Sequence, residues 1–184
     1  MIDLTPQVQF AAARGINEVG QVTGWADASD GSQHAFLYED KSFTDMGELP
    51  GFHTSFGTAL DDHGIVVGTA VNASGKGARL FRAAAPEKFE DLSGKNLFAY
   101  ALATNNLGVV VGYGYGAVTT RALIYSDAFG IQDLNALISP LQGWVIEAAT
   151  DVNDFGVIVG YGFNTRTRKT HAVRLDPMVV PLPE

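Results

Sequence analysis

The chain has 184 residues, of which 21 are Gly and none is Cys, and 12 basic against 20 acidic residues give it a net charge of −8. This length and a hydrophobic content of 46% predict a single domain with a core of its own. The lack of Cys excludes disulfides and thiolate metal sites. The acidic balance disfavours nucleic acid as a partner. The apolar runs, about five residues long, are too short to span a membrane.

In chain order, residues 1–5 have the pattern of a short strand, and the first full unit follows them. Its predicted strands cover residues 13–16, 20–26, 35–39 and 43–46. The first two are joined by Asn17-Glu18-Val19-Gly20, whose Asn and Gly tolerate the left-handed backbone of a tight hairpin. One unit is therefore predicted to be an antiparallel sheet of four strands.

The hairpin of this unit recurs three more times along the chain. Its turn glycines are Gly20, Gly64, Gly108 and Gly156, so the copies are 44, 44 and 48 residues apart, and each is followed four residues later by a strand glycine (Gly24, Gly68, Gly112 and Gly160). The third copy reads Gly-Val-Val-Val-Gly, and the second and fourth each have one Ile among the three β-branched residues, which predicts a strand buried on both faces. Residues 86–95 and 133–138 could each hold one helical turn.

Four antiparallel strands in about 44 residues make up one blade of a β-propeller. We therefore expect an all-β, four-bladed propeller in one domain, with repeats at 10–55, 56–99, 100–147 and 148–178. Residues 1–5 are expected to close the ring by completing the last blade, because closure removes exposed sheet edges. Residues 179–183 are the other candidate for that strand, but Pro181 and Pro183 remove ladder donors, so 179–184 is favoured as a tail.

The repeat resembles the HAF repeat, named for the tripeptide that stands here as His34-Ala35-Phe36. The resemblance also rests on the Ile-Asn-x-x-Gly-x-x-x-Gly pattern and the Asp-Leu pairs, and it covers nearly the whole chain. Copies two and three depart from it, with Gly77-Ala78-Arg79 and Arg121-Ala122-Leu123. The resemblance implies an exported bacterial protein at the cell surface, whose signal sequence would be absent here, and it implies no particular activity.

Aromatic residues follow the strand glycines and are the main candidates for ligand binding. Aromatic rings can stack on sugars or pack between neighbouring blades. Candidate ligand-binding residues on the face of the longer loops are Trp25, Tyr113, Tyr115, Tyr161, His53, Trp144 and Arg166.

Other polar groups give weaker signals. The loop 27–32 could bind calcium or be a plain turn. The Asn and Asp residues that recur in every hairpin have the positions of turn caps. No histidine is placed as a catalytic or metal-binding residue, although His53 could pair with Glu147, and no cofactor is expected.

Charge is concentrated in the first third of the chain. Residues 1–64 contain 10 acidic and 2 basic residues, whereas residues 65–184 contain 10 of each. The leading hypothesis is a non-enzymatic, exported binding or scaffold module that recognises carbohydrate or another cell-surface polymer. The alternatives are a hydrolase or lyase at the axial channel or the His53/Trp144 loop face, and a unit that assembles into homo-oligomers.

Overall fold

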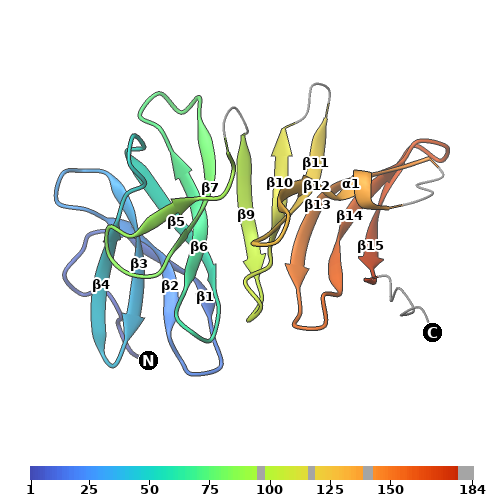
Figure 1. Cartoon of the computed structure of the whole chain (residues 1–184). Coiled ribbons are helices and arrows are strands. Elements are labelled where there is room, and N and C mark those ends of the chain that lie inside the picture. Colours follow the sequence, from blue (N-terminus) through green and yellow to red (C-terminus); the bar gives the residue numbers. More distant parts are fainter. Residues whose placement is uncertain (95–97, 116–118, 139–142, 178–184) are drawn as a thin grey trace.

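The computed structural model describes residues 1–94, 98–115, 119–138 and 143–177. They form four antiparallel sheets arranged side by side in chain order (Figure 1). The predicted tail at 179–184 lies outside the described residues.

Each sheet is a meander of consecutive strands. The first contains β1 (Ala11–Ile16), β2 (Val22–Asp27), β3 (Gln33–Glu39) and β4 (Ser42–Gly47), and the second contains β5 (Thr54–Leu60), β6 (Val66–Val71), β7 (Ala78–Ala83) and β8 (Phe89–Asp91). The third contains β9 (Ala99–Thr104), β10 (Val110–Tyr115), β11 (Thr120–Ser126) and β12 (Gly130–Asp133). The fourth has three strands among the described residues: β13 (Trp144–Val152), β14 (Ile158–Asn164) and β15 (Lys169–Leu175).

The all-β class and the four sheets predicted from the repeat are confirmed. The helical turn expected near residue 133 is present as α1 (Leu134–Leu137). The one expected over residues 86–95 is wrong, because β8 extends across Phe89–Asp91 and pairs with β7.

Residues 1–5 form no strand, so the ring closure expected of them is not formed in this structure. Figure 1 shows the N-terminus beside the first sheet and β15 at the opposite end of the row.

The hydrophobic core lies between neighbouring sheets. Each of three buried clusters joins two consecutive sheets, represented by Phe81 and Met46, by Val67 and Tyr125, and by Val111 and Ile146. Of the described residues, none belongs to a cluster between the fourth sheet and the first. The first strand of each later sheet therefore packs against the sheet before it.

The hairpin turns form a hydrogen-bonded chain from sheet to sheet at the lower end in Figure 1. The Asn17 Nδ2 donates to the Asp61 carbonyl at 2.8 Å, and the Asn105 Nδ2 donates to the Asn153 carbonyl at 2.9 Å. Within each turn the same Asn or Asp accepts backbone N–H bonds, as at Asp61 from Ile65 (2.9 Å). The turn caps thus also hold neighbouring sheets together.

The strand register revises one part of the repeat alignment. Phe36 lies opposite Gly24, and Phe81 lies opposite Gly68. Leu80, not Ala78, therefore corresponds to Ala35, and Arg79 corresponds to His34. The β6–β7 hairpin is one residue longer than the β2–β3 hairpin, and Ala78 follows its strand glycine one residue sooner than Ala35 does, so the alanine is shifted by two positions.

This register explains why the His-Ala-Phe position on the third strand and the Asp of the Asp-Leu pair on the fourth strand lie next to each other. A histidine or arginine on the third strand faces an aspartate on the fourth: His34 with Asp45 at 3.0 Å, Arg79 with Asp91 at 3.5 Å and Arg121 with Asp133 at 3.9 Å. Histidine and arginine thus occupy the same structural position in different copies of the repeat. The sequence departures in copies two and three preserve its charge pairing.

Candidate functional site

The first strand of every sheet is irregular, and in three sheets the bulged side chain lines the same hollow. The pairing of the first strands with the second skips Arg14 in β1, Thr58 in β5 and Leu102 in β9. A bulge leaves its extra residue unpaired and redirects that side chain. Arg14, Thr58 and Leu102 together line one hollow, to which Trp25, Phe56 and Gly57 also contribute.

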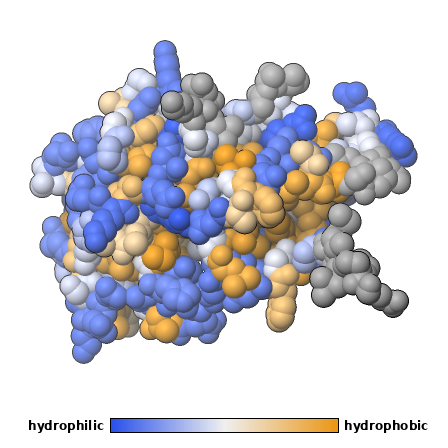
Figure 2. Space-filling model, viewed as in Figure 1, coloured by the Kyte–Doolittle hydropathy of each residue, from blue (hydrophilic) through white to orange (hydrophobic). Residues whose placement is uncertain are grey.

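The walls of this hollow are aromatic. The Trp25 and Phe56 rings meet edge to face, with their centroids 6.1 Å apart. Both side chains are half-buried, which leaves part of each ring accessible. Figure 2 shows apolar residues exposed over the middle of the row, between hydrophilic surfaces.

Three tyrosines form a second aromatic group on the third sheet, next to the hollow through β9. Tyr100 and Tyr113 stack with an interplanar angle of 11° and a centroid separation of 4.9 Å. Tyr115 stands edge-on to both, at 6.0 Å and 6.2 Å, and is 57% exposed. The exposed Tyr115 ring and the neighbouring Tyr100–Tyr113 pair together form an apolar aromatic surface, and their phenol groups can form hydrogen bonds.

The environment keeps two of these phenols protonated. Burial raises the pKa of Tyr113 above its ordinary value of 10.0, and the neighbouring phenols of Tyr115, Tyr100 and Tyr161 add to this. Burial and Tyr115 raise the pKa of Tyr100 in the same direction. Both phenols can therefore donate hydrogen bonds throughout the neutral range.

An ultraviolet absorbance titration of the phenols tests this arrangement. Because a raised pKa delays ionisation, we expect part of the phenolate signal of the native protein to appear at higher pH than in the denatured protein. The late part should shrink in Tyr113→Phe and vanish in denaturant. Identical native and denatured titration curves would contradict the burial of this pair.

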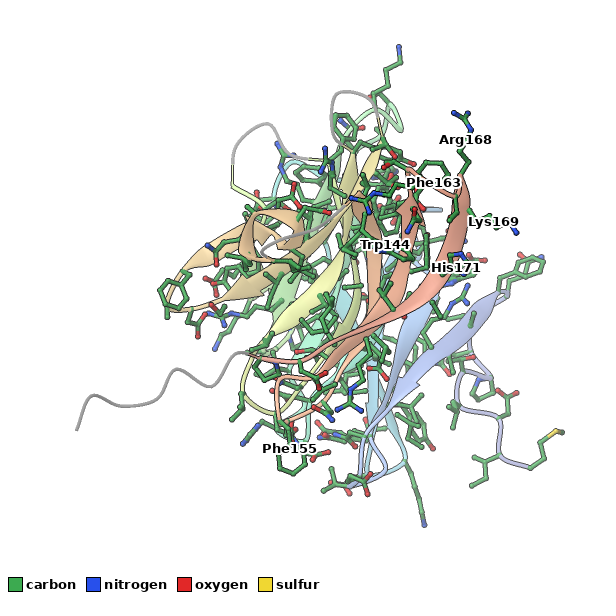
Figure 3. All side chains as sticks on the ribbon, turned by 90° about the vertical axis from the view of Figure 1, so that its right-hand side faces the viewer. Trp144, Phe155, Phe163, Arg168, Lys169 and His171 are labelled. Atoms are coloured by element: carbon green, nitrogen blue, oxygen red, sulfur yellow. The ribbon has the colours of Figure 1, made fainter. Side chains whose placement is uncertain are left out.

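The structure brings together only some of the residues predicted from the sequence. Tyr113 and Tyr115 lie in the tyrosine group, Trp25 lines the hollow, and Tyr161 is 42% exposed on β14 near Tyr113. Trp144 instead packs edge to face on His171, at 5.7 Å (Figure 3).

The remaining predicted residues lie apart from the aromatic surface. His53 is exposed, with its Nδ1 3.9 Å from the exposed Glu48 carboxylate, and the structure records no pair between His53 and Glu147 among the described residues. Arg166 lies in the β14–β15 turn, where its backbone N–H donates to Asn164.

The loop at residues 27–32 has the contacts of a turn. One Asp30 carboxylate oxygen accepts from both the backbone N–H and the hydroxyl of Ser32. These hydrogen bonds lower the pKa of Asp30. Of the residues described, no three His, Asp or Glu side chains form a cluster suited to a metal ion.

Phe56 and Tyr100 were missed as site residues by the sequence analysis. They occupy the same place on the first strands of two sheets, 44 residues apart, and Phe56 contacts Trp25 whereas Tyr100 contacts Tyr113. The 44-residue spacing of two aromatics was the available signal.

No protein-family model and no curated protein matches this chain. No helix in the described part of the chain is long and apolar enough to cross a membrane.

Proposed function

We propose that the chain is a blade array of the β-propeller type that acts as an exported, non-enzymatic binding module for carbohydrate. The repeat's resemblance to the HAF family supports the propeller architecture and the cell-surface location. Four consecutive meanders, each packed through its first strand on the preceding sheet, are also what a propeller requires.

The observation that carries the binding proposal is the accessible aromatic surface along the first two strands of the sheets. Stacked or edge-on rings with protonated phenols bind the apolar faces of sugar rings and hydrogen-bond their hydroxyls. Tyr115 supplies the exposed ring, and Arg14 supplies a cation in the neighbouring hollow. The cation suits sugars that carry a carboxylate or sulfate group.

The same surface gives less support to hydrolysis or elimination. Glycoside cleavage requires a pair of carboxyl groups, and ester cleavage requires an activated nucleophile with a base. The hollow is lined by Arg14, Trp25, Phe56, Gly57, Thr58 and Leu102, which provide neither a carboxylate nor a histidine. The two residues of the alternative enzyme site, His53 and Trp144, have separate partners.

Binding to an array of neutral and acidic glycans, followed by calorimetry on the best ligand, tests the proposal. Tyr115→Ala should weaken binding about tenfold, as expected for the loss of one stacking ring. Tyr115 is at the end of β10 and exposed, so the change leaves the fold intact. Trp25→Ala and Tyr113→Ala should weaken binding at least as much.

The matched control is Phe129→Ala, which removes a 76% exposed ring from the β11–β12 turn. It should bind like the unaltered protein. Absence of binding to every glycan, or equal affinity of Tyr115→Ala and Phe129→Ala, would refute carbohydrate recognition at this surface.

A further inference from the structure

The outer face of the fourth sheet exposes positions that are buried in the other three. Val159 is 41% exposed, whereas its equivalents Thr23, Val67 and Val111 are at most 1% exposed. Ala172 is exposed too, although its equivalents, Ala35, Leu80 and Ala122, are fully covered by the following sheet. Figure 3 looks toward this end of the row, where Trp144 and His171 lie side by side.

β1 exposes the complementary set of positions. Ala11, Ala13 and Ile16 are exposed, and Ile16 is 72% exposed. Their equivalents on β5, Ser55, Gly57 and Leu60, are buried against the first sheet. The two ends of the row therefore present the two halves of one sheet-to-sheet contact that the molecule makes three times internally.

Residues 1–5 carry the pattern of the fourth strand that the last sheet lacks among its described residues. The Thr5 N–H donates to the Asp3 carboxylate at 3.1 Å, the same i to i+2 bond that closes the fourth strand at Asp45, Asp91 and Asp133. Asp3 stands ten residues before Ala13, as Asp91 does before Ala101. Residues 3–13 are thus as long as the connection from the fourth strand of the second sheet to the first strand of the third.

The register of the other sheets predicts what residues 1–5 would meet on β15. Asp45 lies opposite Phe36, and Asp91 lies opposite Phe81, which aligns Asp3 with Val173. Asp3 would then face His171, the one residue at the His34 position of the repeat without an aspartate partner among the described residues. Thr5 would take the place of Ser93, whose Oγ accepts the N–H of Leu80 at 2.6 Å, and would accept from Ala172.

The turn contacts between sheets extend this match. The Glu18 backbone N–H donates to Asp62 and that of Asn106 to Asp154, both from one turn to the next. At the open end, no acceptor for the Asp154 N–H or the Asn153 Nδ2 is found within the described part of the chain, so both can donate in the same way. If the repeat continued into a following first sheet, the Asp154 N–H would donate to the Glu18 carboxylate and the Asn153 Nδ2 to the Asn17 carbonyl.

Charge also favours contact between the two ends. Residues 158–175 contain Arg166, Arg168, Lys169 and Arg174 and no acidic residue, whereas residues 1–64 contain 10 acidic and 2 basic residues. Opposite charges on two surfaces speed their encounter and align them.

We propose that a second copy of this chain docks head to tail, with its residues 1–16 completing the fourth sheet of the first copy. Its residues 1–5 add to the edge of β15 as the fourth strand, and its β1 covers Val159, Tyr161 and Ala172. Such a contact joins unlike surfaces, so it repeats from copy to copy and produces a closed ring or a filament. Within one chain β1 and β15 stand apart (Figure 1), and Ile16 and Val159 remain exposed, although the β1–β2 and β13–β14 turns border one hollow with the two turns between them.

A cross-linking experiment tests the register directly, because the natural chain contains no Cys. In the aligned register Ile2 lies opposite Arg174, as Glu90 lies opposite Arg82, and residues directly opposite are close enough for a disulfide. Mixing Ile2→Cys with Arg174→Cys under mild oxidation should produce a covalent two-chain product. Ile2→Cys mixed with Lys169→Cys, at the far end of β15, is the matched control and should not.

The double variant Ile2→Cys/Arg174→Cys separates the two routes of closure. Head-to-tail docking predicts a ladder of covalent multimers, whereas a monomer with an internal disulfide would overturn the proposal in favour of a ring closed within one chain. Failure of the mixed variants to cross-link would overturn it as well.

Light scattering at micromolar concentrations gives a second measurement that needs no cysteine. The unaltered chain should show a mass of at least twice 19.6 kDa, and Ala172→Glu or deletion of residues 1–6 should return it to that of one chain. Thr167→Glu makes the same charge change in the turn of the same hairpin and should leave the larger mass. A single-chain mass for the unaltered protein across that range would refute the docking.

Discussion

Gly112→Ala is expected to reduce the free energy of unfolding by about 3 kcal/mol or more, at the upper end of overpacking effects. A Cβ at this position would overlap the carbonyl oxygen of Tyr100 and lie 3.2 Å from the Ala101 Cα. β10 pairs with β9 on one side and β11 on the other, so its backbone cannot move away. Urea or thermal unfolding measures the loss.

The matched control is Gly108→Ala in the turn four residues earlier. Gly108 has a φ of +73° and nothing within 4 Å of an added Cβ, so Ala there should cost about 1–2 kcal/mol, for backbone conformation alone. Equal losses for the two variants would show that close approach of the first strand does not constrain the strand glycine.

Asn105→Ala is expected to lower the free energy of unfolding by about 2–3 kcal/mol, because it removes several hydrogen bonds at a buried position. The Asn105 side chain is 5% exposed, accepts from the backbone N–H groups of Leu107 and Val109, and donates to the Asn153 carbonyl of the next sheet. Denaturant unfolding at equilibrium measures the change.

Asn153→Ala is the control that isolates the bond between sheets. Asn153 accepts the same two turn bonds, from Phe155 and Val157, but it is exposed and has no further sheet to donate to among the described residues. Its loss should be smaller by about 1 kcal/mol, the usual net value of one hydrogen bond. If Asn153→Ala is as destabilising as Asn105→Ala, the turns act only locally.

The local elements could be predicted from the sequence because their causes are local. Asn17 and Gly20 specify a tight turn through their own backbone preferences, and the run Val109–Val111 specifies a strand through burial on both faces. Features with little local signal were predicted wrongly or not at all: a helical turn was expected where β8 lies, and the bulges at Arg14, Thr58 and Leu102 were not predicted.

The candidate site was predicted only in part. Tyr113 and Tyr115 could be selected because they follow a strand glycine. Tyr100 and Phe56 belong to other strands, and only the pairing of β9 with β10 and the packing of the first two sheets bring them to Tyr113 and Trp25. The register of β2 with β3 and of β6 with β7 shows that Arg79 takes the place of His34, although the alanine spacing had aligned Gly77 with it.

By itself, the sequence determined the repeat, the four sheets and the two glycines of each hairpin, since turn conformation and strand burial depend on a few neighbouring residues. Only the tertiary structure decided why the strand glycine is required, which aromatic rings meet and where the row of sheets remains open. These features depend on contacts between residues on different strands, such as Gly112 with Tyr100 and Trp25 with Phe56, and the register that creates them is set by hairpin lengths and bulges. The glycine excess thus indicates the fold, whereas the exposed faces at both ends of the row follow from packing.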